Sequence, residues 1–206
     1  WSSDVCSSDL LLAPAPGETQ ELGYLMFELA LIGEFFRRDG WEVAVNVGEG
    51  DPVALAKQRT ATFANRKILL TSTPTVKDFS RIEAEYQRSD QRRYFVPCPS
   101  CGAMQWLKWP QLKWDSNDPT TVLYECEHCR ERFAEIHKPT LLRQGEWRAT
   151  APSDGKTAGF QLSGLYSPLG WLSWTDMVDD FLRAKADAPM LKSFVNTRLA
   201  ETWEED

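Results

Sequence analysis

Apolar side chains return at the spacing of one helix face in two stretches of the chain. Intervals of three or four residues between apolar positions predict amphipathic helices. The first stretch predicts one helix, and the second predicts two helices that Pro189 separates, with Ser173 and Asp176 typical of a capping box at the start. The apolar positions are Leu22, Leu25, Met26, Leu29, Ile32 and Phe36 in the first stretch, and Trp174, Met177, Val178, Phe181, Leu182, Leu191, Phe194, Val195 and Leu199 in the second.

Short apolar runs between turn residues predict strands in the first third of the chain. Residues 10–13, 41–47 and 67–71 are such runs, and a helix beginning at Pro52 is expected to continue to about Phe63. Because strands and helices alternate, the sequence predicts an α/β arrangement, with residues 67–71 buried in a parallel sheet. The expected fold is an α/β fragment (a partial parallel sheet with helices), then a β-rich module that carries the cysteines described next, and a helical C-terminal connector.

Four of the five cysteines form two Cys-x-x-Cys pairs, Cys98 with Cys101 and Cys126 with Cys129. Each pair lies beside an alternating, β-rich segment, and 24 residues separate the pairs, a slightly wide spacing that a longer loop through residues 115–119 would explain. Two such turns can close a tetrahedral site of four thiolates, which predicts a structural zinc in a zinc ribbon. A rubredoxin-type iron centre is the alternative, because Cys-Pro-x-Cys-Gly is also found there.

Residues beside the cysteines modify this prediction only slightly. Gly102 follows the first pair and permits a positive φ, whereas Arg130 takes the same place after the second pair and adds a positive charge near the thiolates. His128 and His137 are interpreted as non-ligands, because four thiolates suffice. Cys6 lies in a low-complexity leader and is not expected to take part.

The charge balance argues against a basic surface that binds nucleic acid along the whole chain. The 206 residues carry 23 Lys and Arg against 30 Asp and Glu, a net charge of −7. Residues 94–138 carry five cations and six acids, which favours a scaffold or partner-docking module over a DNA clamp. No apolar run approaches the ~18 residues of a membrane span and no secretory signal is visible, so a cytoplasmic protein without membrane contact is expected.

Three hydroxyl residues follow the predicted strand at 67–71. Ligands of open α/β sheets bind beyond the carboxyl ends of strands, so Thr71, Ser72 and Thr73 are candidates for orienting a water or sensing a phosphate. By spacing alone, the same residues also describe a turn before Pro74.

Two further groups of residues are interpreted as non-catalytic. The only Gly-Lys-Thr, at residues 155–157, lacks the first glycine of a phosphate-binding loop, because position 150 is Thr. Four acids near the end of the chain are interpreted as a solvated tail rather than a two-metal site, since they cluster within six residues. These acids are Glu201, Glu204, Glu205 and Asp206.

Several short motifs in residues 48–206 resemble the large terminase subunit of tailed phages, most closely the lambda-like GpA group. They include Glu-Gly-Asp-Pro at 49–52, Ser-Thr-Pro-Thr at 72–75 and Glu-Thr-Trp at 201–203. In that family the Ser-Thr-Pro-Thr stretch links ATP hydrolysis to DNA movement, so the resemblance implies this coupling role for Thr71, Ser72 and Thr73. The family also carries a cysteine-rich insertion soon after this motif.

The resemblance implies an ATP- and magnesium-dependent motor and endonuclease in the host cytoplasm. Its substrate would be double-stranded phage DNA, and its partners the small terminase subunit and the portal. Because the chain lacks the family's phosphate-binding loop, acidic magnesium strand and nuclease acids, it is expected to be a fragment that is inactive alone. The alternative is a non-catalytic zinc-ribbon interaction module fused to a partial regulator domain, since residues 11–46 resemble the start of a cobalamin-binding regulator domain.

The expected organisation has five segments, with a fusion junction near Val47 and Gly48. They are an adapter-like artefactual leader (1–10), a partial βαβ unit (11–47), the C-terminal part of an ATPase domain (48–93), a zinc-ribbon insertion (94–138), and a connector leading to a nuclease domain (139–206).

Overall fold

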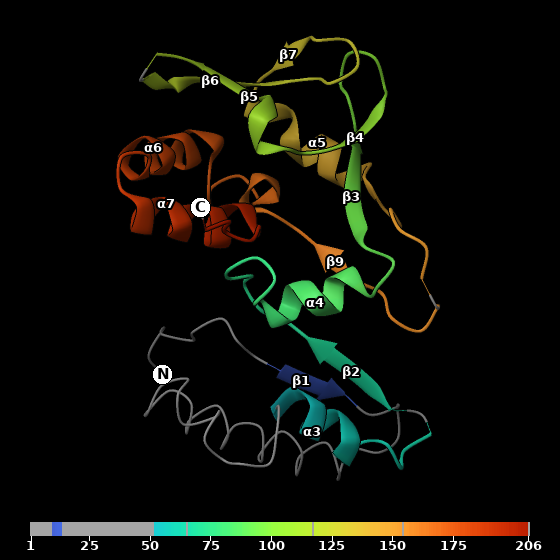
Figure 1. Cartoon of the computed structure of the whole chain (residues 1–206). Coiled ribbons are helices and arrows are strands. Elements are labelled where there is room, and N and C mark those ends of the chain that lie inside the picture. The colour runs from blue at the N-terminus through green and yellow to red at the C-terminus, as the bar shows by residue number, and fades with distance from the viewer. Residues whose placement is uncertain (1–9, 14–51, 65, 117, 154, 206) are drawn as a thin grey trace. The chain divides into compact units, whose positions relative to one another are not determined.

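The structure, a computed structural model, divides into two compact units at Ser72 and Thr73, and each unit is described by itself (Figure 1). The expected helix at residues 22–36, the expected strand at 41–47 and most of the leader lie outside the described residues. Those described are 10–13, 52–64, 66–116, 118–153 and 155–205. None of the helices in these ranges is long and apolar enough to cross a bilayer.

The described residues of the first unit form two strands and a helix, β1 (Leu10–Ala13), α3 (Pro52–Arg59) and β2 (Lys67–Leu70). Strand β2 pairs antiparallel with β1, so the expected parallel pairing of this strand is not confirmed among the described residues. Its side chains alternate between exposed and half-buried, which is the pattern of a strand covered on one face only. The apolar run had suggested burial on both faces, but Leu69 is 50% exposed.

The described part of the second unit forms two small sheets and a set of short helices. In the first sheet β3 lies between β4 and β8, both antiparallel to it, and β9 pairs parallel to β3; the second sheet is antiparallel with the order β5-β6-β7. The elements are α4 (Arg81–Gln87), β3 (Arg92–Pro97), β4 (Met104–Trp106), η1 (Trp109–Gln111), β5 (Leu112–Asp115), β6 (Asp118–Glu125), β7 (Arg132–Phe133), η2 (Glu135–His137), α5 (Lys138–Arg143), β8 (Glu146–Arg148), β9 (Phe160–Gln161), η3 (Gly164–Tyr166), α6 (Trp174–Ala184), α7 (Ala188–Phe194) and η4 (Val195–Leu199).

A tight hairpin joins β5 to β6, where the sequence suggested a longer loop through residues 115–119. Asp115 and Asp118 are cross-strand partners, so only two residues connect the strands, and Ser116 has a φ of 50°. The Thr121 hydroxyl accepts a hydrogen bond from the Asp115 backbone N–H at 2.8 Å. Polar residues that suggested a loop thus stabilise a turn, because their side chains satisfy backbone groups.

Helix α6 carries the capping box that its sequence predicts. The Ser173 hydroxyl accepts a hydrogen bond from the Asp176 N–H at 3.0 Å, and the Asp176 carboxylate accepts one from the Ser173 N–H at 3.0 Å. Hydrogen bonds from Ser173 also hold the pKa of Asp176 below its usual value. Helix α6 ends at Ala184, and Pro189 lies in the first turn of α7 rather than at the end of α6.

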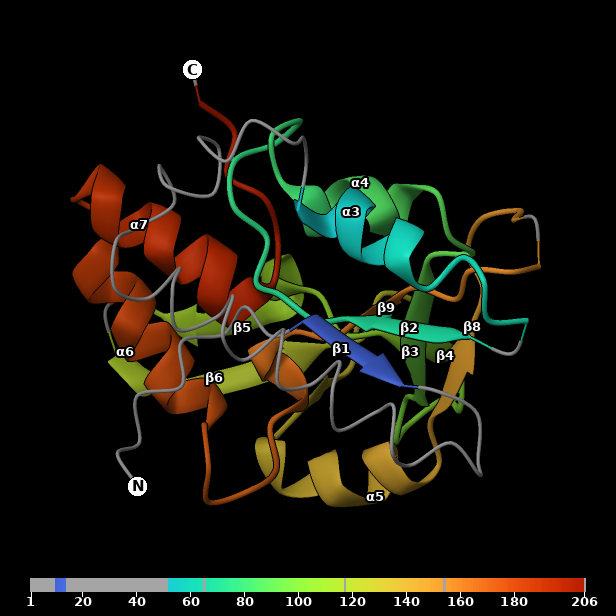
Figure 2. The ribbon, with the colours of Figure 1, turned by 90° about the horizontal axis from the view of Figure 1, so that it is seen from below.

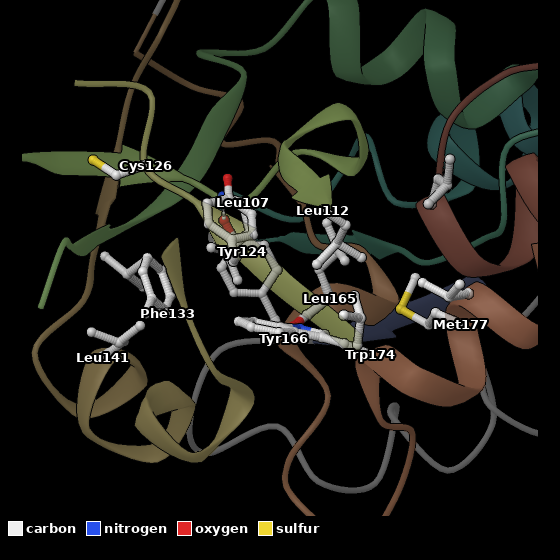
Figure 3. Close-up of a cluster of buried hydrophobic side chains, with 14 of the residues drawn as sticks. Leu107, Leu112, Tyr124, Cys126, Phe133, Leu141, Leu165, Tyr166, Trp174 and Met177 are labelled. Carbon is white, nitrogen blue, oxygen red and sulfur yellow. Dashed lines mark hydrogen bonds between the residues drawn. The ribbon is translucent and has the colours of Figure 1, made fainter. Parts of the chain in front are cut away.

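The core of this unit joins the second sheet to the C-terminal helices. Figure 2 shows α6 and α7 beside β5 and β6. Trp174 of α6 is fully buried, and its ring centroid lies 5.7 Å from that of Tyr124 on β6 (Figure 3). The Trp174 indole N–H donates to the Leu165 carbonyl at 3.0 Å, and the Tyr124 hydroxyl accepts from the Lys108 N–H at 3.0 Å. These buried polar atoms are therefore satisfied within the core.

Candidate metal centre

Two hairpin tips bring four cysteine side chains together. Cys98 and Cys101 lie between β3 and β4, and Cys126 and Cys129 lie between β6 and β7. All four sulfur atoms lie within 4.8 Å of one another, and no other His, Cys, Asp or Glu of the described residues joins this group. Cys98 Sγ lies 3.8 Å from Cys129 Sγ, and Cys101 Sγ lies 3.9 Å from Cys126 Sγ.

These sulfur separations fit a tetrahedral metal. Four sulfurs at about 2.3 Å from a central zinc would lie about 3.8 Å apart, the edge of the corresponding tetrahedron. Both measured separations match this edge and are far longer than the ~2.05 Å of a disulfide bond. The structure therefore brings together the four predicted ligands in an arrangement that can hold one metal ion.

The first hairpin tip closes on itself through two backbone hydrogen bonds. Cys98 N–H donates to the Ala103 carbonyl, and Gly102 N–H donates to the Cys98 carbonyl, both at 2.9 Å. Gly102 has a φ of +72°, in the left-handed region that glycine adopts without steric cost.

The second hairpin tip has the same pattern with an arginine in place of the glycine. Cys126 N–H donates to the Glu131 carbonyl at 3.0 Å, and Arg130 N–H donates to the Cys126 carbonyl at 3.1 Å. Arg130 has a φ of +64°. The two tips are therefore conformationally equivalent, and the fold imposes a left-handed backbone on Arg130 that its Cβ disfavours.

Burial and crowding of the thiols shift their pKa values in different directions. Cys98 and Cys126 are buried, whereas Cys101 and Cys129 are exposed. Burial raises the pKa of Cys98. Burial acts in the same direction on Cys126, but backbone N–H groups of Cys129 and His128 and the neighbouring thiols lower its pKa to about 7.

The pKa of Cys129 shifts in the direction opposite to that of Cys126. The Glu131 N–H opposes the shift, yet desolvation by the surrounding atoms and the three neighbouring thiols raise the pKa of Cys129 to about 12. One thiolate in the cluster therefore disfavours the next, so a cation is needed to hold all four thiolates at neutral pH.

Gln105 joins the two hairpins behind the cysteines. This residue of β4 is 2% exposed, and its side-chain oxygen accepts a hydrogen bond from the Glu127 N–H in the second tip at 3.0 Å. Lys108 adds an ion pair to the Glu127 carboxylate at 2.8 Å. Sequence analysis missed Gln105, although a polar residue at an inward position of an alternating strand is the signal that could have found it.

The three candidate hydroxyl residues directly follow β2, which ends at Leu70. Thr71, Ser72 and Thr73 lie in a segment without regular secondary structure, and the boundary between the two units falls between Ser72 and Thr73. Further on, Trp203 N–H donates to the Thr75 carbonyl at 2.9 Å. The segment after the hydroxyl residues thus pairs with the end of the described chain, which sequence analysis did not predict.

The acidic residues near the end of the described chain do not converge on one point. Glu204 pairs with Lys77, and Glu205 pairs with Lys192 at 2.9 Å. Burial raises the pKa of Glu201. Asp206 lies outside the described residues.

The Gly-Lys-Thr at residues 155–157 lies in a bend and an irregular segment. Gly155 has a φ of +72°, and the next regular element among the described residues is the two-residue strand β9. No helix follows directly, as a phosphate-binding loop requires.

Comparison with known proteins identifies relatives for both halves of the chain. The ATPase-domain family described as "Phage terminase large subunit gpA, ATPase domain" matches residues 37–147, more than half of the chain. The family described as "Terminase large subunit gpA, endonuclease domain" matches residues 157–206. No solved structure matches the chain.

Two curated proteins are similar to this chain over most of its length. The large terminase subunit of Enterobacteria phage P21 is 33% identical over 183 residues, and that of Escherichia phage lambda is 33% identical over 181 residues. Each match covers 76% of this chain but only 28% of the relative. An ATPase-domain match is thus followed by an endonuclease-domain match in the same sequence. The chain therefore belongs to the lambda-like family of phage terminase large subunits, of which it corresponds to a fragment.

Proposed function

We propose that this chain is part of a motor that packages double-stranded phage DNA with ATP and cuts it as an endonuclease. The observation that carries the proposal is the succession of an ATPase-family match and a nuclease-family match along the same chain. ATP and magnesium would act in the intact ATPase and nuclease. The partners would be the small terminase subunit and the portal, in the host cytoplasm.

The four-cysteine cluster is proposed to be a structural zinc ribbon. Thiolates are ligands that zinc favours, and four protein ligands leave no position for a substrate, which is typical of structural rather than catalytic zinc. Zinc there would contribute folding energy by fixing the two hairpin tips against each other. Metal analysis of the purified chain is expected to find about one zinc per chain, whereas iron with visible colour would indicate a rubredoxin-type centre.

Thr71, Ser72 and Thr73 are proposed to form the segment that couples ATP hydrolysis to DNA movement. Two observations support this role. The segment follows β2 directly and spans the division between the two compact units. The next residues pair with Trp203, within the part of the chain that matches the nuclease family.

The coupling role can be tested in an intact motor. Residues 48–206 would replace the matching segment of the lambda large subunit, and ATP-driven DNA packaging would be compared with ATP hydrolysis. Thr73→Ala is expected to reduce packaging far more than hydrolysis, because the side chain would couple the two steps. Thr140→Ala, at an exposed position of α5, is the matched control. Packaging that is unchanged by Thr73→Ala would remove Thr73 from the coupling role.

A further inference from the structure

One face of the β4-β3-β8 sheet contains no fully buried side chain. Strand residues alternate between faces, so Val96 points into the core while Arg93 and Phe95 point to the other side. Phe95 is the cross-strand partner of Trp106 on β4, and Arg93 is the partner of Arg148 on β8. These four residues, with Lys108 just beyond β4, are called the outer face below.

Cations cover the aromatic rings of the outer face. The Arg148 guanidinium lies 5.1 Å from the centroid of the Phe95 ring, and Lys108 Nζ lies 3.9 Å from the Trp106 ring. The two rings meet edge to face with centroids 5.2 Å apart. The rings therefore orient the cations above the sheet, and ring faces occupied by cations offer little room for stacking a base.

Two arginines of the outer face oppose each other directly. Arg93 and Arg148 are paired in register across β3 and β8, and like charges in this relation are destabilising. Arg93 Nη1 donates to the Gln161 side chain rather than to a carboxylate, and its guanidinium lies 5.6 Å from the Tyr86 ring. An anion bound between the two arginines would relieve the repulsion.

The surrounding sequence is locally positive, although the chain as a whole is negative. Residues 86–93 and 143–161 together carry six Lys and Arg and three Asp and Glu, a net charge of +3 against −7 for the whole chain. Three acidic residues interact electrostatically with cations of the outer face: Glu146 with Arg148, Glu127 with Lys108, and Glu201 with Arg93. The Arg148–Glu146 pair is exposed, so a phosphate can replace this carboxylate at small cost, whereas the Lys108–Glu127 pair is half-buried.

We propose that the outer face contacts the phosphate backbone of duplex DNA, independently of base sequence. The proposal rests on the proposed function, since a packaging motor must hold a duplex. Three cations held by the sheet supply phosphate contacts, and the covered rings favour a duplex over a single strand, whose bases would need open aromatic faces.

The test uses the zinc-loaded full chain and a short fluorescein-labelled DNA duplex of arbitrary sequence. Fluorescence anisotropy would give the dissociation constant from about 50 to about 200 mM salt. The double variant Arg93→Gln and Arg148→Gln is expected to weaken binding and to reduce the salt slope by about two, one for each lost cation. Arg132→Gln, at an exposed ion pair on β7 of the other sheet, is the matched control and should leave the slope unchanged.

The following outcomes would contradict the proposal. An absence of duplex binding at low salt overturns it, as does a salt slope that the double variant leaves unchanged while its zinc content and melting temperature stay normal. Tighter binding of a single strand, lost in Trp106→Leu, would overturn the preference for a duplex. If duplex binding fails while packaging by the chimeric lambda motor still depends on Thr73, the outer face has failed and the motor function has not.

Discussion

A single residue, Arg130, shows how the hairpin tip at the cysteine cluster constrains local backbone geometry. Gly102 and Arg130 occupy equivalent places in two hairpin tips, with φ values of +72° and +64°. A left-handed conformation costs a residue with a Cβ roughly 1–2 kcal/mol, whereas glycine adopts it freely. The second tip is therefore less favourable in its backbone than the first.

Arg130→Gly is expected to stabilise the metal-loaded chain by about 1 kcal/mol, because it removes this backbone cost. Gly102→Ala, the reverse change at the first tip, should destabilise the chain by a similar amount. Urea unfolding at neutral pH would measure both changes. Arg130→Ala is the control, because it removes the contact with Glu125 at 3.7 Å but keeps a Cβ. If Arg130→Ala stabilises the chain as much as Arg130→Gly, the charge rather than the backbone is responsible.

At the scale of elements, helix α6 depends on the two residues that cap its start. Its capping box satisfies two backbone N–H groups that would otherwise have no partner in the first turn. The buried side of the helix includes Trp174 and Met177, so the cap holds a helix that contributes directly to the core.

Ser173→Ala is expected to lower the free energy of unfolding by about 1 kcal/mol at neutral pH. Asp176 has a pKa below its usual 3.8, so the stability from its ionised form is present above that value and is lost as the pH falls through the folded pKa. The effect of Ser173→Ala should therefore shrink in acid. Urea midpoints at neutral and acidic pH would measure this, with Ser193→Ala in α7 as the control. An effect of the same size at both pH values would exclude a role for the Asp176 carboxylate.

At the scale of the second unit, the proposed metal centre and the core share one strand. Strand β6 carries Tyr124 in the core and ends at Glu125, immediately before Cys126 (Figure 3). Tyr124 packs on Trp174, whose backbone N–H donates to the Glu135 carboxylate at 3.1 Å. Loss of the metal should therefore change the environment of Trp174, which lies far from the cysteines in sequence.

Chelation of the metal is expected to shift tryptophan emission to longer wavelength and to lower the melting temperature. The physical reason is that four thiols released from a cation regain protons and no longer fix the two hairpins against each other. Cys98→Ser should reproduce both changes without chelator, and Ser100→Ala, at an exposed position between the ligands, should not. Unchanged tryptophan emission after complete metal removal would show that the packing of the core does not depend on the metal.

Local patterns in the sequence predicted several elements correctly, and for identifiable reasons. The apolar spacing of α6 and its capping residues act within a few positions of one another, so the helix could be predicted without knowledge of its neighbours. The pairing direction of β2 could not be predicted, because an apolar run does not specify which strand pairs with it. Likewise, Ser116 and Asp118 suggested a loop, whereas a hydrogen bond across the turn from the Asp115 N–H to Thr121 stabilises a hairpin.

The sequence by itself determined the family of this chain, the four cysteines and the cap of α6, because each depends on residue identity or on short spacing. Only the tertiary structure decided which groups meet: Gln105 with Glu127, the segment after Thr73 with Trp203, and Arg93 with Arg148. These contacts join residues far apart along the chain, and their register follows from strand pairing and core packing. Spacing along a sequence carries no such information, since every pairing changes when the register changes.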